Sequence, residues 1–210
     1  MTTLELSQIG SGFSDTSLGS QSVFRAALEA LSYPGRKVPL EVTFEAPKAA
    51  HASSSGLLLA LLEPGSLLWL SPSLAHSDAA TWIVFHTDCK ITLDQHEADF
   101  AWIKNWEELP RLESFALGTD EYPDHSTTCV IDLAVPSSPA ASTPSLSLMG
   151  PGIAHTSTLD QLSATSAQAA DFVSQWTQNH SCFPCGVDVF FATSTGLIGL
   201  PRTTRIDISG

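Results

Sequence analysis

Two short apolar runs near the carboxyl end of the chain constrain its fold more than any other feature. Residues 187–192 are nearly all apolar and rich in β-branched and aromatic side chains, and a second apolar run ends at Leu200. A Thr/Ser/Gly segment, residues 193–196, lies between them and supplies a reversal. Short apolar runs bounded by turn residues are typical of buried strands, so this region predicts a closing β-hairpin.

Two charged residues interrupt this apolar region. Asp188 lies inside the first predicted strand, and Arg202 follows the second strand directly after Pro201. A charge inside a buried strand is costly unless it has a partner. Two interpretations remain open at this point: a structural ion pair between Asp188 and Arg202, and a functional site that uses both residues.

Helical and strand patterns alternate along the rest of the chain. Apolar residues at helical spacing predict a helix that starts at Ser20 or Ser22 and ends at Tyr33 to Gly35. Interleaved strands and helices favour an α/β layer architecture with a mixed central sheet. The other expected helices cover residues 57–62 and 166–179, and the other expected strands cover residues 38–44, 67–70, 81–87, 98–103, 127–135 and 146–149.

The length of 210 residues fits one large domain. We expect residues 1–19 to form an irregular arm, because they are rich in Ser, Thr and Gly. Residues 20–210 then form a single α/β domain. Residues 136–144 are a Ser/Pro/Ala segment, which predicts a surface loop inside that domain.

The charge of the chain argues against two classes of partner. Its formal net charge is −13, and its nine Lys and Arg residues form no basic cluster, so nucleic acid and anionic membranes are poor partners. No signal peptide is visible, and the longest purely apolar run, residues 57–62, is far too short to cross a bilayer. The four cysteines do not suggest a secreted disulfide scaffold. We therefore expect a cytoplasmic protein.

No complete catalytic or metal-binding set is visible. His180, Cys182 and Cys185 could contribute to a zinc site or form a redox dithiol, but three ligands lack the fourth that structural zinc requires. The alternative for Cys185 is a small apolar core residue. Gly150 to Gly152 could cradle a phosphate, but it lacks a longer glycine pattern and a P-loop lysine, and a simple turn is the alternative.

Four segments, taken in chain order, are similar to one known family. They are Phe24 to Leu28 with Pro34 and Gly35, Gly150 to Ile153, Phe183 to Asp188, and Gly199 to Thr204. Together they resemble the PhnH family, a subunit of the bacterial carbon–phosphorus lyase system, over residues 12 to 205. The segments Phe-Pro-x-Gly-Val-Asp and Gly-Leu-Pro-Arg-Thr-Thr are the most specific. The chain departs from the family pattern in two places. Cys185 stands where an aliphatic residue is expected, and residues 136–144 are an insertion.

The resemblance implies a three-layer αβα sandwich like that of pyridoxal-phosphate-dependent transferases, without their cofactor site. It also implies a subunit that assembles with PhnG, PhnI and PhnJ. That assembly makes α-D-ribose 1-methylphosphonate 5-triphosphate from a phosphonate and ATP. We accordingly expect no catalytic, cofactor-binding or metal-binding residues, and no cofactor, in this chain.

Two functions from different classes remain open. The first is a non-catalytic scaffold subunit, in which Gly150, Pro151, Gly152, Asp188, Pro201, Arg202 and Thr203 serve structure or partner contact. The second is an independent enzyme that binds a phosphate ester or a pyridoxal-like ligand near the same residues. The ten Phe and five Trp with only 15% charged residues also lead us to expect a homodimer when the chain is isolated.

Overall fold

A mixed seven-stranded sheet forms the centre of the protein. The computed structural model describes residues 9–133, 144–160 and 162–208. Strands β8, β5, β4, β2 and β3 are parallel, β9 is antiparallel to β8, and β1 is antiparallel to β9. The spatial order is β1 (Lys37–Pro39), β9 (Gly196–Leu200), β8 (Asp188–Thr193), β5 (Thr128–Asp132), β4 (Phe100–Ile103), β2 (Leu67–Leu70) and β3 (Lys90–Thr92).

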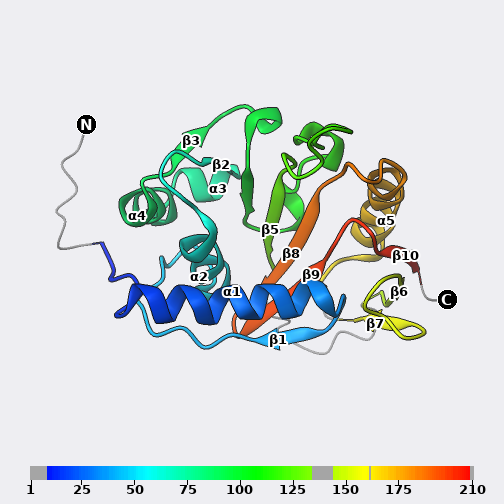
Figure 1. Ribbon diagram of the computed structural model, residues 1–210, viewed down its shortest axis with the longest axis horizontal. Coiled ribbons are helices and arrows are strands. Elements are labelled where there is room, and N and C mark those ends of the chain that lie inside the picture. Colours follow the sequence, from blue (N-terminus) through cyan, green and yellow to red (C-terminus); the bar gives the residue numbers. More distant parts are fainter. Residues whose placement is uncertain (1–8, 134–143, 161, 209–210) are drawn as a thin grey trace.

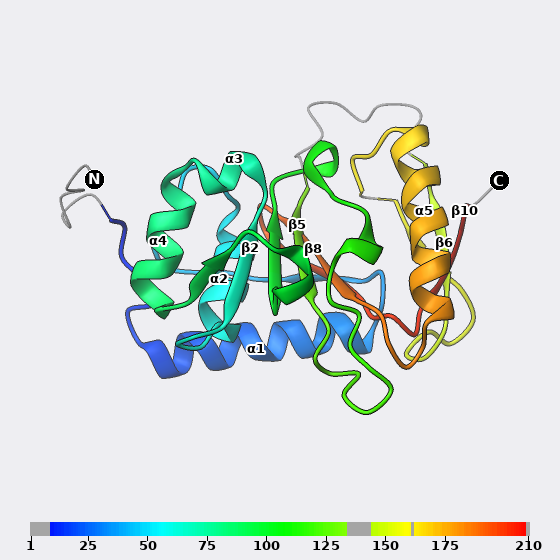
Figure 2. The same cartoon turned by 90° about the horizontal axis from the view of Figure 1, so that it is seen from above.

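Helices cover both faces of this sheet (Figures 1 and 2). One face packs against four helices, α1 (Thr16–Ser32), α2 (Ala52–Leu61), α3 (Pro72–Ala75) and α4 (Asp78–Thr87). The other face packs against α5 (Ser166–Ser181) and two short 3-10 helices, η3 (Trp106–Glu108) and η4 (Leu112–Ser114). A further 3-10 helix, η2 (Gln95–Glu97), connects β3 to β4. The expected α/β architecture with a mixed sheet is confirmed.

The central strands are apolar on both faces because each face has its own core. Trp102, Val130 and Phe190 lie in the core under α1, α2 and α4, and all three are buried. The residues that follow them, such as Ile103 and Phe191, lie in the core under α5. Successive side chains of a strand point to opposite faces, so a strand buried on both sides reads as a continuous apolar run.

A second, smaller sheet adjoins α5. It contains β10 (Arg205–Ile208), β6 (Leu146–Met149) and β7 (Ser157–Leu159), paired antiparallel in the order β10-β6-β7. Leu148 and Ile206 of this sheet share the core of Phe172 and Trp176 from α5. The sheet therefore extends the α5 side of the molecule.

The closing hairpin has the expected form. β8 and β9 pair antiparallel, and Thr193 lies opposite Gly196 at the turn. The backbone of α1 lies directly against β9, since a Cβ atom at Gly199 would be 2.5 Å from the carbonyl carbon of Ala30. Only glycine allows this approach of helix and strand.

The strand expected at residues 81–87 is wrong, because these residues belong to helix α4. The side chain of Ser77 caps this helix by accepting a hydrogen bond from the backbone N–H of Ala79. Ala79, Trp82 and Ile83 are buried at helical spacing. The cap and this burial outweigh the strand preference of the β-branched and aromatic residues in the run.

Other boundaries also differ from those expected. Helix α1 begins at Thr16, ahead of Ser20 and Ser22, because Asp15 accepts a hydrogen bond from the N–H of Leu18 at 3.0 Å. The irregular arm expected over residues 1–19 is therefore wrong for residues 16–19, which are helical. Helix α2 begins before residue 57, and three buried serines form its first turns. The strand expected at 38–44 covers only Lys37–Pro39.

The Ser/Pro/Ala loop expected at residues 136–144 lies almost wholly outside the described residues. Only residue 144 of this segment is described. Among the described residues, no helix is both long and apolar enough to cross a membrane.

Candidate functional site

Three of the stretches that carry the family resemblance, residues 34–35, 150–153 and 199–204, meet at the end of α1 nearest the small sheet (Figure 1). The N–H of Gly35, after α1, donates to the carbonyl of Gly199 in β9 at 3.2 Å. A Cβ atom at Gly150 would lie 3.0 Å from the carbonyl oxygen of Thr203. Gly35 and Gly199, which are 164 residues apart in the chain, are thus in contact, and these stretches form one structural unit.

The turn at Gly150 to Gly152 packs against backbone. The N–H of Ile153 donates to the carbonyl of Gly150 at 3.2 Å and closes the turn. Gly152 has a positive φ of 81°, and a Cβ atom there would lie 2.1 Å from the carbonyl oxygen of Ser32. Pro151 is exposed. These glycines therefore let the turn approach α1 and the segment after β9.

The ion pair expected between Asp188 and Arg202 is present. The Nη2 of Arg202 lies 2.5 Å from Oδ2 of Asp188, and its Nε lies 3.2 Å from both carboxylate oxygens. The backbone N–H of Arg202 also donates to Oδ1 of Asp188 at 2.7 Å. The side chains of Arg202 and Asp188 are 14% and 23% exposed, so water screens the pair only in part.

The remaining donors of Arg202 hold two further loops. Nη1 donates to the carbonyl oxygens of Pro123 at 2.8 Å and Pro184 at 3.3 Å. Nη2 donates to Oγ of Ser126 at 2.5 Å. A guanidinium has five N–H donors, and each of these has an acceptor inside the protein. No donor of Arg202 is left for a phosphate or carboxylate ligand.

The end of α5 is fixed to the same region. Nδ1 of His180 donates to the carbonyl oxygen of Arg202 at 2.8 Å. The side chain of Asn179 accepts from the N–H of Val187 at 2.8 Å and donates to its carbonyl at 2.9 Å. Trp176 Nε1 donates to the carbonyl of Thr204 at 2.7 Å. We call Asp188, Arg202 and these contacts the arginine clasp.

The interpretation of Cys185 as a core residue is wrong. Cys185 is half-buried, Cys182 is exposed, and both lie in the turn between α5 and β8. Both ring nitrogens of His180 are engaged, because Nε2 lies 3.3 Å from Nε of Arg205. Among the described residues, no group of three or more His, Cys, Asp or Glu side chains is placed to hold a metal ion.

Sequence reasoning missed a second polar group, at the carboxyl ends of the parallel strands. Asp132 ends β5, Lys104 directly follows β4, and His51 precedes α2. Oδ2 of Asp132 accepts from the N–H of His51 at 2.9 Å, and Lys104 Nζ donates to the carbonyl of Ala49. The sequence could have indicated this group, because Asp132 and Lys104 stand at or directly after the ends of apolar strands. Polar residues at the carboxyl ends of parallel strands gather at one edge of an α/β sheet.

Asp132 is buried, and its surroundings change its acidity. Its side chain has 1% exposure, and Oδ1 has no hydrogen-bond partner among the described residues. Burial raises the pKa of Asp132 above its ordinary value of 3.8, while Ser54, His51 and Lys104 oppose that shift. Asp132 thus joins α2 to the sheet at a cost in desolvation.

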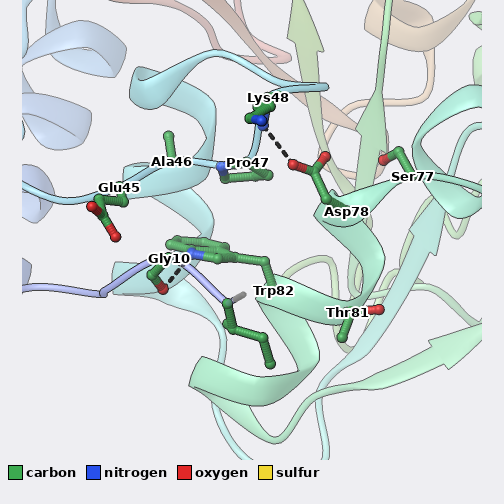
Figure 3. A pocket seen from close by; sticks show the side chains of 10 residues that line it. Gly10, Glu45, Ala46, Pro47, Lys48, Ser77, Asp78, Thr81 and Trp82 are labelled. Carbon is green, nitrogen blue, oxygen red and sulfur yellow. Dashed lines mark hydrogen bonds between the residues drawn. The ribbon is translucent and has the colours of Figure 1, made fainter. Parts of the chain in front are cut away.

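A separate cavity of about 560 Å³ lies on the α4 side (Figure 3). Trp82 lines it, and Trp82 Nε1 donates to the carbonyl of Gly10 at 3.1 Å. Asp78 at its rim accepts from the N–H groups of Lys48 at 2.7 Å and Ala49 at 3.2 Å. None of the residues singled out from the sequence lines this cavity.

The arginine clasp makes a prediction about stability. Arg202→Lys keeps the charge but cannot reach the carbonyls of Pro123 and Pro184, Ser126 and Asp188 at once. We expect a loss of about 2 kcal/mol or more in the free energy of unfolding, measured by urea denaturation. Arg111→Lys is the control, because its pair with Glu113 is exposed, and its urea midpoint should not change. Equal midpoints for both variants would contradict a structural role for the clasp.

Asp132 makes a prediction about pH. The pKa of Asp132 is higher in the folded than in the unfolded protein, so the folded state binds more protons. The contribution of Asp132 to the stability of the fold therefore falls as pH rises above about 4. Asp132→Asn keeps an acceptor for His51 but does not titrate. Relative to wild type, this variant should therefore gain stability between pH 4 and pH 7 in urea denaturation. A difference that stays constant over this range would show that the pKa is not raised.

Comparisons with known proteins agree with the resemblance. A family model described as "Bacterial phosphonate metabolism protein (PhnH)" matches residues 11–207. "Alpha-D-ribose 1-methylphosphonate 5-triphosphate synthase subunit PhnH" of Rhizobium meliloti (strain 1021) is 33% identical over 202 residues, covering 96% of this chain and 97% of the relative. "Putative C-P lyase subunit protein HtxG" of Stutzerimonas stutzeri is 29% identical over 206 residues, covering 90% and 87%. The chain belongs to the PhnH family of bacterial phosphonate metabolism proteins.

Proposed function

We propose that this chain is a non-catalytic scaffold subunit of the complex that forms α-D-ribose 1-methylphosphonate 5-triphosphate from a phosphonate and ATP. The names of its relatives support a subunit role, since one is a subunit of that synthase and the other a putative C-P lyase subunit. The match covers 97% of the first relative's length.

One observation carries this proposal: every N–H donor of the Arg202 guanidinium already has an acceptor inside the protein. The most specific family residues, including Asp188 and Arg202, use their polar groups on one another and on nearby backbone. Residues that recognise a substrate need donors or acceptors that are open to it. These residues therefore serve the shape of the protein, and the alternative of a phosphate-ester enzyme at this site is not favoured.

The finer expectations about fold and cofactor belong to the same proposal. We infer a three-layer αβα sandwich like that of pyridoxal-phosphate-dependent transferases, in a single domain that includes the whole of α1, with no pyridoxal phosphate bound. Two of the lysines support the last point: Lys37 Nζ donates to Thr195 at 2.9 Å, and Lys104 Nζ donates to the carbonyl of Ala49. Four free cysteines support a reducing compartment such as the cytoplasm.

We propose PhnG, PhnI and PhnJ as the partners, and a homodimer for the isolated chain. The outer face of α1 suits self-association, because Phe24 and Leu28 are 48% and 50% exposed one helical turn apart. The helix contains one Arg and one Glu, so it is neutral in a chain with a net charge of −13. Two copies can therefore meet at α1 without net charge repulsion between the two helices.

The scaffold role is tested by reconstitution. This chain is mixed with PhnG, PhnI and PhnJ, and synthase activity is measured with and without it. We expect the chain alone to show no turnover with ATP and methylphosphonate, and to co-elute with the other subunits in size exclusion. Turnover by the chain alone, or failure to co-elute, would contradict the proposal.

The homodimer is tested by light scattering after size exclusion. We expect the mass of two chains for wild type and of one chain for Leu28→Glu, because the new charge would be buried in the interface. Phe85→Glu is the control, since Phe85 is 54% exposed on α4 and is not part of the proposed α1 interface, and this variant should remain dimeric. A monomeric wild type, or a dimeric Leu28→Glu, would exclude this interface.

A further inference from the structure

Two cysteines, Cys182 and Cys185, are the first and last residues of the turn that follows α5. Cys182 is the residue after the helix, and the N–H of Cys185 donates to the carbonyl of Cys182 at 2.9 Å. A hydrogen bond from residue i+3 to residue i closes a β-turn, in which the two Cα atoms are less than about 7 Å apart. A disulfide requires Cα atoms roughly 4.4–6.8 Å apart. The backbone of the turn is therefore compatible with a disulfide.

The two thiols are also open to reaction. Cys182 is exposed and Cys185 is half-buried, whereas Cys89 and Cys129 are buried. Burial raises the pKa of the thiols of Cys89 and Cys129 above the ordinary value. Because the thiolate is the nucleophile, these two cysteines are protected by both burial and protonation. Oxidation is thereby directed to the turn.

Only weak contacts hold the two sulfur atoms. Sγ of Cys182 lies 3.4 Å from the carbonyl oxygen of Gln178, and Sγ of Cys185 lies 3.9 Å from Oδ1 of Asp120. Thiols are weak donors, so rotation about the Cα–Cβ bonds toward each other costs little. No backbone hydrogen bond has to break for this rotation.

We propose that Cys182 and Cys185 are a thiol modification site that forms a reversible internal disulfide, with a low-molecular-weight disulfide such as glutathione disulfide as the oxidant. The thiolate of Cys182 attacks one sulfur of glutathione disulfide and releases one glutathione thiolate. The thiolate of Cys185 then attacks Sγ of Cys182 and releases the second. Two protein thiols are oxidised, one glutathione disulfide is reduced to two glutathione molecules, and the two thiol protons pass to these products.

The arginine clasp tolerates this reaction. The segment after the turn is held by Asn179, which bonds both backbone groups of Val187, and by the N–H of Gly186, which donates to the carbonyl of Leu117 at 2.7 Å. The turn itself contributes only the carbonyl of Pro184 to Arg202. A link between Cys182 and Cys185 therefore closes the turn without removing any acceptor of Arg202.

The test uses the full-length folded protein and glutathione disulfide at millimolar concentration. After acid quenching, intact mass and peptide mapping should show that wild type has lost two hydrogen atoms, with a link between Cys182 and Cys185 and no bound glutathione. Internal disulfide should exceed doubly glutathionylated protein at least about tenfold, because the second attack is intramolecular. Dithiothreitol should restore both thiols.

Single variants complete the test. Cys182→Ser and Cys185→Ser should each retain one glutathione on the remaining thiol, whereas Cys129→Ala should behave as wild type. Wild-type protein that carries two glutathiones, or that keeps both thiols free, would overturn the proposal. The peptide map of the oxidised wild-type protein decides between these outcomes even if a serine variant fails to fold. This test does not depend on the proposed scaffold role.

Discussion

The guanidinium of Arg202 is the contact on which the carboxyl-terminal half of the structure depends. It neutralises Asp188 at the start of β8 and binds the carbonyls of Pro123 and Pro184, which belong to the loops before β5 and β8. A planar group with five donors in fixed directions can do this, and a lysine cannot. Because Arg202 follows β9 directly, the hairpin, the end of α5 and the loop before β5 are all fixed to one another.

The sequence was most informative where local pattern and tertiary burial agree. The hairpin at β8 and β9, helix α5 and the Asp188 to Arg202 pair could all be expected, because an apolar run with a charge inside it leaves few structural solutions. Residues 81–87 show the opposite case. Their β-branched and aromatic residues favour a strand locally, but the cap at Ser77 and the burial of Trp82 make them helical.

Contacts between distant residues were the part that could not be predicted. The sequence gives no sign that Arg202 reaches Pro123 and Ser126, since these acceptors are brought near only by the completed fold. Asp132, His51 and Lys104 could have been found as polar residues at strand and helix ends, but their contacts could not. Cys185 was placed in the core by its apolar neighbours, whereas the turn after α5 brings it to the surface.

The central claim is that the family-specific residues shape the protein and do not touch substrate. The most direct test is a structure, by electron cryomicroscopy, of the assembled complex with this chain, ATP or a non-hydrolysable analogue, and methylphosphonate. The account predicts that Arg202 keeps Asp188, Pro123 and Pro184 as its partners and that no ligand atom lies within hydrogen-bond distance of its guanidinium. A phosphate or phosphonate oxygen bound to Arg202 in place of these partners would contradict it.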